Sequence, residues 1–504
     1  MTTQNTKNLW SAAQACLGAT GSLSVIMPAY GLETVIERNI ETVCRLLEGN
    51  IPFEVLPVDD GSRDGTAAAI RRAAARDPDH VHPVFVQVNA GKGNALKCGF
   101  AAARGSHILL LDADLDLDPV RITTFFDIMA EKQAAIVIGS KRHPDSVIDY
   151  PWHRRLSSVI YYTIVRLLIG LPISDTQTGM KLFTREALAW SFERMLVKTF
   201  AFDLEVLSIA HAQGYTVAEA PIEMHFGEKV GCLSWTNVKQ VMIDTLAIFY
   251  RLRILRYYDS VEIVPPPEKP LFVSVVIACP GPSPYLTECL EALALQTYPH
   301  FEALVLPDAP CDLGPVPFTL HVIPTGKIRP AEKRNIGIQQ ARGEVVAFLD
   351  DDAYPVPAWI EQAIKYFTMP DVGGVGGPGV TPPGDPFLGQ ASGRVYANPL
   401  VSGNYRYRYL GDRVRASIDD FPSCNLFVRT DVLRAIGGYR TDFWPGEDTI
   451  LCADIAIGQK RRIIYDPWVQ VFHHRRPLFG PHLRQIGRYA LHRGYFAKRF
   501  PATS

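Results

Sequence analysis

Two clusters of carboxylates each follow a short apolar run and could bind a divalent cation. The run "ILLLDAD" ends in Asp112 and Asp114, and the run "VVAFLDDD" ends in Asp350, Asp351 and Asp352. Because alternate residues of a strand point to the same side, the outer carboxylates of each cluster can converge. Two like charges held close together are unfavourable unless a cation neutralises them. Oxygen ligands suit Mg²⁺ or Mn²⁺, which can also hold the phosphate oxygens of a substrate.

Both halves of the sequence predict the strands and helices that would position these acids. An ungapped alignment of the two clusters also superposes Gly99 on Gly337, and "ARG" at 103–105 on "ARG" at 341–343. Apolar strands alternate with helices in both halves, which predicts an α/β fold with two mostly parallel sheets covered by helices. In such sheets ligands bind beyond the carboxyl ends of the strands, where both acid clusters fall.

A proline-rich stretch between the two halves predicts the domain boundary. "DSVEIVPPPEKP" contains four prolines and neither helical nor strand periodicity, as expected of a stiff linker. The predicted parts are a leader at 1–21, a first domain at 22–258, the linker at 259–270, a second domain at 271–480 and a basic amphipathic segment at 481–504.

The composition is that of an ordinary globular protein. The net charge of −1 does not indicate a class of binding partner, so recognition must depend on local clusters of charge. The nine cysteines are odd in number and form no CxxC pair, which suits a reducing cytoplasm better than a disulfide framework or a zinc ribbon. No run of 18 residues is apolar and free of charge, so no membrane span is predicted.

Motifs in both halves resemble glycosyltransferase family 2, inverting enzymes with the GT-A fold. The first half resembles polyprenyl-phosphate sugar synthases of the dolichol-phosphate mannose and glucose type, through "PAYGLE", "VDDGSRDGT", "DADLDLDP", "DTQTGMKLF" and "FDLEVLSIAHAQGY". The second half resembles bacterial polysaccharide-assembling transferases, through "EKRNIGIQQARGEVVAFLDDD", "SCNLFVRTDVLRAIGGY", "FWPGEDTILCADI" and "VFHHRRP". The resemblance covers roughly residues 22–500.

The resemblance implies roles for residues of the first half. The nucleotide-sugar donor would be bound by Pro28, Tyr30, Glu33, Asp60, Lys92, Asp112, Arg142 and Gln177. The metal would be held by Asp112, Asp114 and Asp116. A phosphate acceptor is already an anion and needs cations such as Lys92 and Arg142 more than a strong base. Asp203 is a candidate catalytic residue, and Asp203 and Glu205 either orient reacting groups or pack at the start of a helix.

The second half carries a fuller set of catalytic candidates. The donor would be bound by Asp308, Arg334 and Asp351, and the metal by Asp350 and Asp352 with His473 or His474. Asp448 would be the base that deprotonates a hydroxyl acceptor, with Glu447 raising its pKa. The "GED" at 446–448 also suits a helix N-terminus, where acids are favoured. "PDAP" and "CPGPSP" depart from the family pattern on the side that would bind the nucleotide. These departures bear on which nucleotide base and which donor sugar the second half prefers.

Basic and apolar segments predict contact with a membrane surface. Residues 152–173 and 235–258 combine apolar runs with arginines, and no acid occurs from Pro467 to the end. Basic amphipathic helices can lie in the interface of an anionic bilayer, although a helix packed on its own domain would show the same pattern. No nucleic acid is expected as a partner.

We therefore predict a bifunctional, metal-dependent inverting hexosyltransferase, peripheral at the cytoplasmic face of the inner membrane and active in cell-envelope polysaccharide biosynthesis. The donors would be UDP- or GDP-sugars. The first domain would transfer a sugar to polyprenyl phosphate, and the second to a hydroxyl of a glycan or a lipid-linked acceptor. Two alternatives are that only one domain is catalytic and the other is a binding module, or that the protein is a sugar nucleotidyltransferase.

Overall fold

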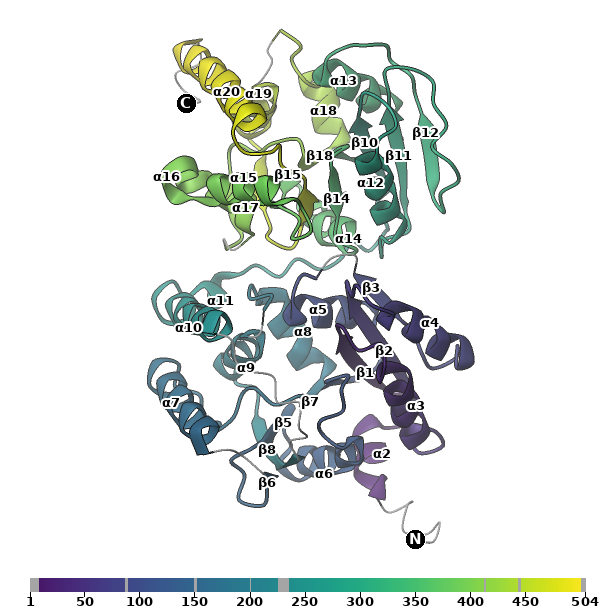
Figure 1. Cartoon of the computed structure of the whole chain (residues 1–504), viewed down its shortest axis with the longest axis vertical. Helices are drawn as coiled ribbons and strands as arrows, with labels where there is room; N and C mark the ends of the chain where they lie inside the picture. Colours follow the sequence, from purple (N-terminus) through teal and green to yellow (C-terminus); the bar gives the residue numbers. More distant parts are fainter. Residues whose placement is uncertain are drawn as a thin grey trace. The chain divides into compact units, whose positions relative to one another are not determined.

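The computed structural model describes residues 9–86, 89–148, 152–199, 201–224, 235–411, 414–442 and 446–499. The chain divides into two compact units, Met1–Val261 (unit 1) and Glu262–Ser504 (unit 2), each an α/β structure (Figure 1). No helix in these described ranges is long and apolar enough to cross a membrane.

Unit 1 contains one large sheet whose strands are mostly parallel. Its strands are β1 (Leu23–Ala29), β2 (Phe53–Asp60), β3 (Val84–Val86), β4 (His107–Leu111), β5 (Ile136–Ser140), β7 (Met180–Thr184) and β8 (Val217–Pro221), in the order β3-β2-β1-β4-β7-β5-β8. Strand β7 is antiparallel to both of its neighbours. A small separate sheet pairs β6 (Val147–Ile148) with β9 (Glu223–Met224).

Helices cover both faces of this sheet. One face carries α2 (Ser11–Leu17), α3 (Ile36–Leu47), α4 (Thr66–Arg76) and α6 (Ile122–Lys132). The other face carries α5 (Lys92–Ala102), α8 (Arg185–Arg194) and α9 (Phe202–Ala212). The remaining helical segments are α7 (Trp152–Leu168), α10 (Trp235–Phe249), α11 (Tyr257–Ser260), η1 (Pro119–Arg121) and η2 (Tyr250–Ile254). Trp10 and Ala13, within the stretch predicted as a leader, are buried in the first of these faces.

Unit 2 repeats this order and adds one strand. Its strands are β10 (Val273–Ala278), β11 (Phe301–Leu306), β12 (Thr319–Val322), β13 (Val345–Asp350), β15 (Val372–Gly376), β17 (Ala416–Ile418), β18 (Asn425–Arg429) and β19 (Arg462–Tyr465), in the order β12-β11-β10-β13-β18-β15-β19-β17. A second sheet contains β14 (Ala353–Pro355), β20 (Val471–His473) and β16 (Gly379–Val380). The predicted α/β fold with two mostly parallel, helix-flanked sheets is confirmed.

The helices of unit 2 also pack on its sheet. They are α12 (Pro284–Ala294), α13 (Pro330–Gln340), α14 (Trp359–Ile364), α15 (Phe387–Ala397), α16 (Pro399–Ser402), α17 (Tyr407–Leu410), α18 (Thr430–Ile436), α19 (Glu447–Ala453) and α20 (Gly480–Arg499), with η3 (Lys365–Thr368), η4 (Gly403–Arg406) and η5 (Asp454–Gly458). Residues of α13, α17, α18, α19 and η5 share one buried cluster with strand residues of the main sheet.

A buried glutamate explains why "ARG" recurs in the two halves. In unit 1, Glu54 Oε1 accepts hydrogen bonds from Ser24 Oγ at 2.6 Å and from the backbone N–H of Arg104 at 2.5 Å. The Gly105 N–H donates to Ser24 Oγ at 2.7 Å, and a side chain at Gly105 would collide with Ser24. This network joins β1, β2 and the loop that enters β4. The same contacts recur in unit 2 among Ser274, Glu302, Arg342 and Gly343.

The aligned glycines let one helix lie directly on each sheet. An added Cβ at Gly99 in α5 would lie 2.5 Å from Ile26 Cγ2, and one at Gly337 in α13 would lie 2.5 Å from Val276 Cγ1. Carbon atoms pack at about 3.5–4.0 Å, so neither position has room for a methyl group.

We expect Gly337→Ala to lower the free energy of unfolding of unit 2 by about 1–3 kcal/mol, because the methyl group forces α13 away from β10. Differential scanning calorimetry of the full chain measures this. Gly487→Ala in α20 is the matched control, since a Cβ there meets no atom within 4 Å. An unchanged or higher melting temperature for Gly337→Ala would contradict the close packing of α13.

Candidate active sites

The first acid cluster lies where β4 meets the turn that follows it. The Asp112 N–H donates to the Gly179 carbonyl at 2.9 Å, which continues the pairing of β4 with β7. Gly179 leaves room for the acid, because a Cβ there would lie 2.6 Å from Asp112 Oδ2. Leu115 then adopts a positive φ of 55°, unusual for a large side chain, and its N–H donates to the Asp112 carbonyl at 3.1 Å. This tight turn presents Asp112 and Asp114 beyond the end of β4.

Lys92 neutralises part of this charge. Its Nζ lies 2.5 Å from Asp112 Oδ1. Burial acts to lower the pKa of Lys92, but the charges of Asp112 and Asp203 outweigh it and raise the pKa. Burial raises the pKa of Asp114, and so do its neighbours Asp112 and Asp116. The ligand atoms of Asp112, Asp114 and Asp116 do not all come within 4.8 Å of one another, so the three predicted metal ligands do not form a compact three-acid site.

The predicted nucleotide residues of unit 1 gather at the ends of β1 and β2. Pro28 lies in β1, and Tyr30, just beyond it, is half exposed. Glu33 Oε2 accepts a hydrogen bond from the Gly65 N–H at 2.7 Å, which ties the loop after β1 to the start of α4. Asp60, the last residue of β2, completes this group.

Asp60 holds the loop that leads to Lys92. Its two carboxylate oxygens accept hydrogen bonds from the N–H groups of Ala90 and Gly91, each at 3.0 Å. Burial raises the pKa of Asp60 to about 6, although these two hydrogen bonds act to lower it. A group buried in this way and still able to ionise near neutral pH is typical of a ligand-binding position.

Arg142 and Gln177, the remaining donor candidates of unit 1, occupy two loops joined by Asp175. Arg142 lies over the ring of Tyr162 at 4.5 Å. Gln177 is exposed, and its N–H donates to Asp175 Oδ1 at 3.0 Å. Asp175 Oδ2 accepts a hydrogen bond from the Lys141 N–H at 3.1 Å, so the two loops are held together.

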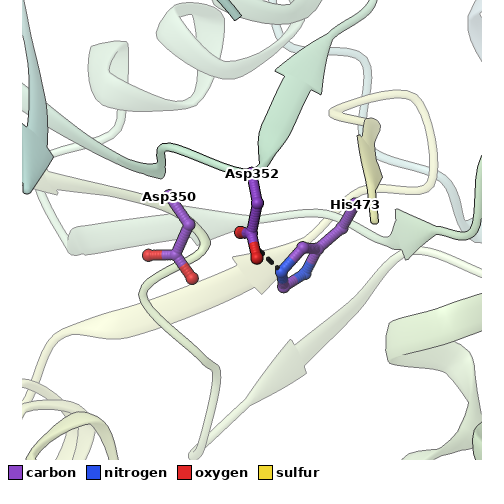
Figure 2. A group of neighbouring side chains, drawn as sticks. All are labelled: Asp350, Asp352 and His473. Atoms are coloured by element: carbon purple, nitrogen blue, oxygen red, sulfur yellow. Dashed lines mark ion pairs between the residues drawn. The ribbon is translucent and has the colours of Figure 1, made fainter. Parts of the chain in front are cut away.

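The second acid cluster contains two carboxylates and an imidazole. Ligand atoms of Asp350, Asp352 and His473 lie within 4.8 Å of one another, the only such trio in the described parts of the chain (Figure 2). Antiparallel pairing of β14 with β20 sets Ala353 opposite His473, which brings the imidazole to Asp352. The Nε2 atom of His473 lies 3.1 Å from Asp352 Oδ1. Burial acts to lower the pKa of His473, but Asp352 outweighs it and raises the pKa to about 10.

The neighbouring His474 turns away from this cluster. Its Nδ1 lies 2.6 Å from Asp385 Oδ1, and its Nε2 lies 2.8 Å from Glu288 Oε2. Successive side chains at the end of a strand point to opposite sides, so the two histidines cannot both face the acids. Of the two predicted histidines, the structure brings only His473 to Asp350 and Asp352.

Arg334 joins the acid cluster to the predicted base. Its Nη2 lies 2.9 Å from Asp350 Oδ1, and its Nη1 lies 3.5 Å from Glu447 Oε1 and 3.9 Å from Asp448 Oδ1. Burial acts to lower the pKa of Arg334, but these three acids and Tyr439 outweigh it and raise the pKa further. The guanidinium therefore stays charged between three carboxylates.

Asp448 is partly buried and is oriented by a hydroxyl pair. Ser423 Oγ donates to Asp448 Oδ1 and lies 2.5 Å from the Tyr439 hydroxyl. Burial raises the pKa of Asp448. Burial and the charge of Asp448 raise the pKa of Glu447 to about 7. Two acids at the start of α19 thus hold protons more readily than free carboxylic acids, as a general base near neutral pH requires.

The nucleotide side of unit 2 differs from that of unit 1. Asp308 is paired with Lys333, whose Nζ lies 2.5 Å from Asp308 Oδ1 and 2.6 Å from the Cys279 carbonyl. Asp60, its counterpart in unit 1, instead accepts hydrogen bonds from two backbone N–H groups. Burial and the flanking acids Asp350 and Asp352 raise the pKa of Asp351 to about 7.

The two units place an acid at the same point of equivalent helices. In each sheet order, α9 and α19 follow the antiparallel central strand and its helix, and Asp203 and Asp448 are their second residues. In unit 1 this acid is paired with the buried Lys181, with Nζ to Oδ1 at 2.7 Å. The short motifs "FDLE" and "GED" hide this equivalence, which only the topology reveals.

Sequence patterns also missed Tyr489 and left the role of Glu205 open. Partial burial raises the pKa of Tyr489 in α20, and the charges of Asp448, Asp350 and Glu447 raise it further. Spacing along the chain could not have linked Tyr489 to these acids.

Glu205 has a packing role. It is fully buried, accepts hydrogen bonds from the N–H groups of Leu196 and Val197 at 2.9 and 2.7 Å, and contacts Tyr258 and Arg251. Glu205 therefore fixes the loop before α9, and of the two roles considered for it the structure favours packing.

Comparison with known proteins matches the chain to the family described as Glycosyl transferase family 2, over residues 24–190 and 274–437. Human dolichyl-phosphate beta-glucosyltransferase is 32% identical over 259 residues, which cover 47% of this chain and 76% of that protein. Glycosyltransferase AglD of Haloferax volcanii is 32% identical over 212 residues, which cover 42% of this chain and 34% of AglD. The chain thus spans about a third of the length of AglD.

Among solved structures, glucosyl-3-phosphoglycerate synthase from Mycobacterium tuberculosis in complex with uridine diphosphate superposes with a TM-score of 0.37 at 15% identity, covering 53% of this chain and 87% of that one.

The two stretches that match the family fall one in each unit. The predicted family and enzyme class are therefore confirmed: the chain is a glycosyltransferase that belongs to glycosyl transferase family 2.

Proposed function

We propose that the chain is a bifunctional inverting glycosyltransferase with one active site in each unit. Unit 1 transfers a sugar from a nucleotide sugar to polyprenyl phosphate, and unit 2 transfers a sugar to a hydroxyl of a glycan or lipid-linked acceptor. The observation that carries this proposal is the contrast between two acids. Asp448 accepts a hydrogen bond from Ser423 and has its nearest cation, Arg334, 3.9 Å away, whereas Asp203 is paired directly with Lys181 at 2.7 Å. The alternatives of a single catalytic unit and of nucleotidyl transfer are outcomes of the tests below.

Unit 1 is suited to an anionic acceptor. Lys181 neutralises Asp203 at the position where unit 2 carries its base, and Lys92 neutralises Asp112. A phosphate oxygen needs no base to attack the anomeric carbon, and a cationic surround attracts it. The 32% identity to dolichyl-phosphate beta-glucosyltransferase supports a lipid phosphate acceptor for this unit.

Unit 2 is suited to a hydroxyl acceptor. Asp448 takes the proton of the hydroxyl as the new bond to the anomeric carbon forms on one face of the sugar. The bond to the nucleoside diphosphate breaks on the opposite face, so the configuration inverts. Arg334, between Asp448 and Asp350, holds both carboxylates in place and offers positive charge near the departing phosphate. A positioned general base contributes about 10²–10⁴-fold to the rate.

A divalent cation, Mg²⁺ or Mn²⁺, fits the donor atoms of unit 2. Asp350, Asp352 and His473 would hold it, because two carboxylates and an imidazole bring ligand atoms within 4.8 Å of one another. When bound, it would stabilise the negative charge on the departing diphosphate. Asp112 and Asp114 would hold the ion in unit 1. Asp60, Asp308 and their neighbours are the residues that we expect to distinguish a UDP-sugar from a GDP-sugar.

The place of action that we propose is the cytoplasmic face of a membrane. In unit 1, exposed apolar residues occur on α7 and α10 and in the segment after α10, among them Leu167, Leu246 and Ile254. A polyprenyl phosphate lies in a bilayer, so an enzyme that uses it gains from an apolar and basic face.

The two activities should separate in the full-length chain. We expect Asp448→Asn to reduce transfer to hydroxyl acceptors by at least about 100-fold, because no base remains, while transfer to polyprenyl phosphate stays unchanged. Asp112→Asn should do the reverse. Radiolabelled nucleotide sugars measure both, with the lipid product counted in an organic extract.

Three results would contradict this division. Absence of lipid-soluble label from the unaltered chain would refute the role of unit 1. Full activity of Asp448→Asn would make unit 2 a binding module. Release of pyrophosphate in place of nucleoside diphosphate would indicate nucleotidyl transfer.

The metal site of unit 2 can be tested apart from activity. In a background of Asp112→Asn, which removes the other candidate site, we expect Asp352→Asn to weaken Mn²⁺ binding at least about tenfold in calorimetry or electron paramagnetic resonance. Asp371→Asn is the matched control, since Asp371 is exposed and paired with Arg462 outside the cluster. Equal Mn²⁺ affinity in the two variants would rule out Asp352 as a ligand.

A further inference from the structure

Unit 2 exposes a group of large apolar side chains that its own core leaves uncovered. They lie on two segments far apart in the sequence, 386–411 and 478–499, which contain α15 to α17 and α20 (Figure 1). The exposed fraction is 79% for Phe387, 95% for Leu400, 53% for Val401, 64% for Phe479, 61% for Leu483 and 77% for Leu491. We call these two segments the apolar face.

Contacts between α15 and the start of α20 join the two segments into one surface. The Leu478 N–H donates to the Leu388 carbonyl at 3.0 Å. The buried His482 lies 2.6 Å from Ser392 Oγ and contacts the ring of Tyr396, with 4.9 Å between ring centres. Helix α20 is therefore fixed to α15 through one side, which leaves Leu483 and Leu491 exposed.

The charge of this face has one sign. Neither residues 386–411 nor residues 467–504 contain an aspartate or a glutamate, in a chain with 52 such residues. The exposed cations on the two segments are Arg394, Arg406, Arg484, Arg488 and Lys498, and Arg476 lies just before the second segment. Exposed aliphatic side chains surrounded by cations match an anionic lipid surface, where apolar groups enter the acyl boundary and cations meet head groups.

The apolar face leads to the candidate active site of unit 2. Arg475 lies over the rings of Tyr396 and Tyr409, at 5.7 and 5.1 Å, and its Nη1 lies 3.2 Å from His473 Nδ1. An acceptor held in the lipid surface would meet these residues before it reaches the acids.

We propose that the apolar face docks unit 2 on an anionic bilayer, so that its acceptor is a lipid-linked molecule presented from that surface. This inference rests on the proposed hydroxyl transfer by unit 2 and chooses the lipid-linked acceptor over a free glycan. The face belongs to unit 2 alone and is separate from the apolar residues of α7 and α10.

A local probe tests the docking even if unit 1 also binds lipid. The full chain with Leu400→Trp is mixed with vesicles of phosphatidylcholine containing about one third phosphatidylglycerol, with or without brominated acyl chains. Ile457→Trp is the matched control, because Ile457 is also exposed, at 61%, and lies near the cations Lys460 and Arg461 but outside the apolar face. We expect brominated lipid to quench the added fluorescence of Leu400→Trp at least about twofold and that of Ile457→Trp hardly at all.

A second variant measures the strength of docking. Leu400→Glu with Leu491→Glu should require about tenfold more lipid for half-maximal sedimentation with vesicles, whereas Ile457→Glu should behave as the unaltered chain. Equal quenching at the two positions, or none at Leu400→Trp with the protein bound, would overturn the proposal. Self-association in solution that Leu400→Glu abolishes would also overturn it and make a second copy the occupant.

Failure of docking can be told apart from failure of the proposed function. Release of nucleoside diphosphate from a nucleotide sugar in the absence of vesicles reports the active sites without the apolar face. We expect Leu400→Glu with Leu491→Glu to leave this release unchanged. If release is normal and docking fails, only the lipid-linked acceptor of unit 2 is refuted.

Discussion

Negative charge gathered at the carboxyl edge of each sheet is the constraint on which both candidate sites depend. In each unit a cation from the equivalent helix neutralises part of this charge. The cation is Lys92 from α5 in unit 1 and Arg334 from α13 in unit 2. The two cations occupy different positions in their helices. Lys92 begins its helix and holds one acid, whereas Arg334 lies one turn in and reaches Asp350, Glu447 and Asp448. Arg334 thus links Asp350 to the proposed base, whereas in unit 1 a second cation, Lys181, pairs with Asp203.

The fold and the position of the acids could be predicted from the sequence because both depend on local patterns. Apolar strands and the alternation of strands with helices reflect short-range requirements, and the twofold recurrence of "ARG" marks the loop whose N–H groups Glu54 and Glu302 bind. The acids follow strand ends, so their edge of the sheet is fixed once the sheet is recognised. The family resemblance added roles to residues whose place was already determined.

The rest depends on contacts between distant segments, which spacing does not encode. His473 and His474 are adjacent in sequence, yet the pairing of β14 with β20 directs only the first to the acids. The partner of Asp203 is Lys181, which comes from β7. The buried Trp10 likewise shows its packing only in three dimensions. Each is a tertiary contact between residues with no periodic relation along the chain.

The space beside Asp112 has a consequence for inherited variation. Gly179 lies just before β7, more than sixty positions along the chain, and even the smallest side chain there would press on the carboxylate. A missense change at this glycine would therefore displace Asp112, although the two residues are far apart in the sequence. Surveys that score such alleles by stability alone would overlook this effect on the candidate site.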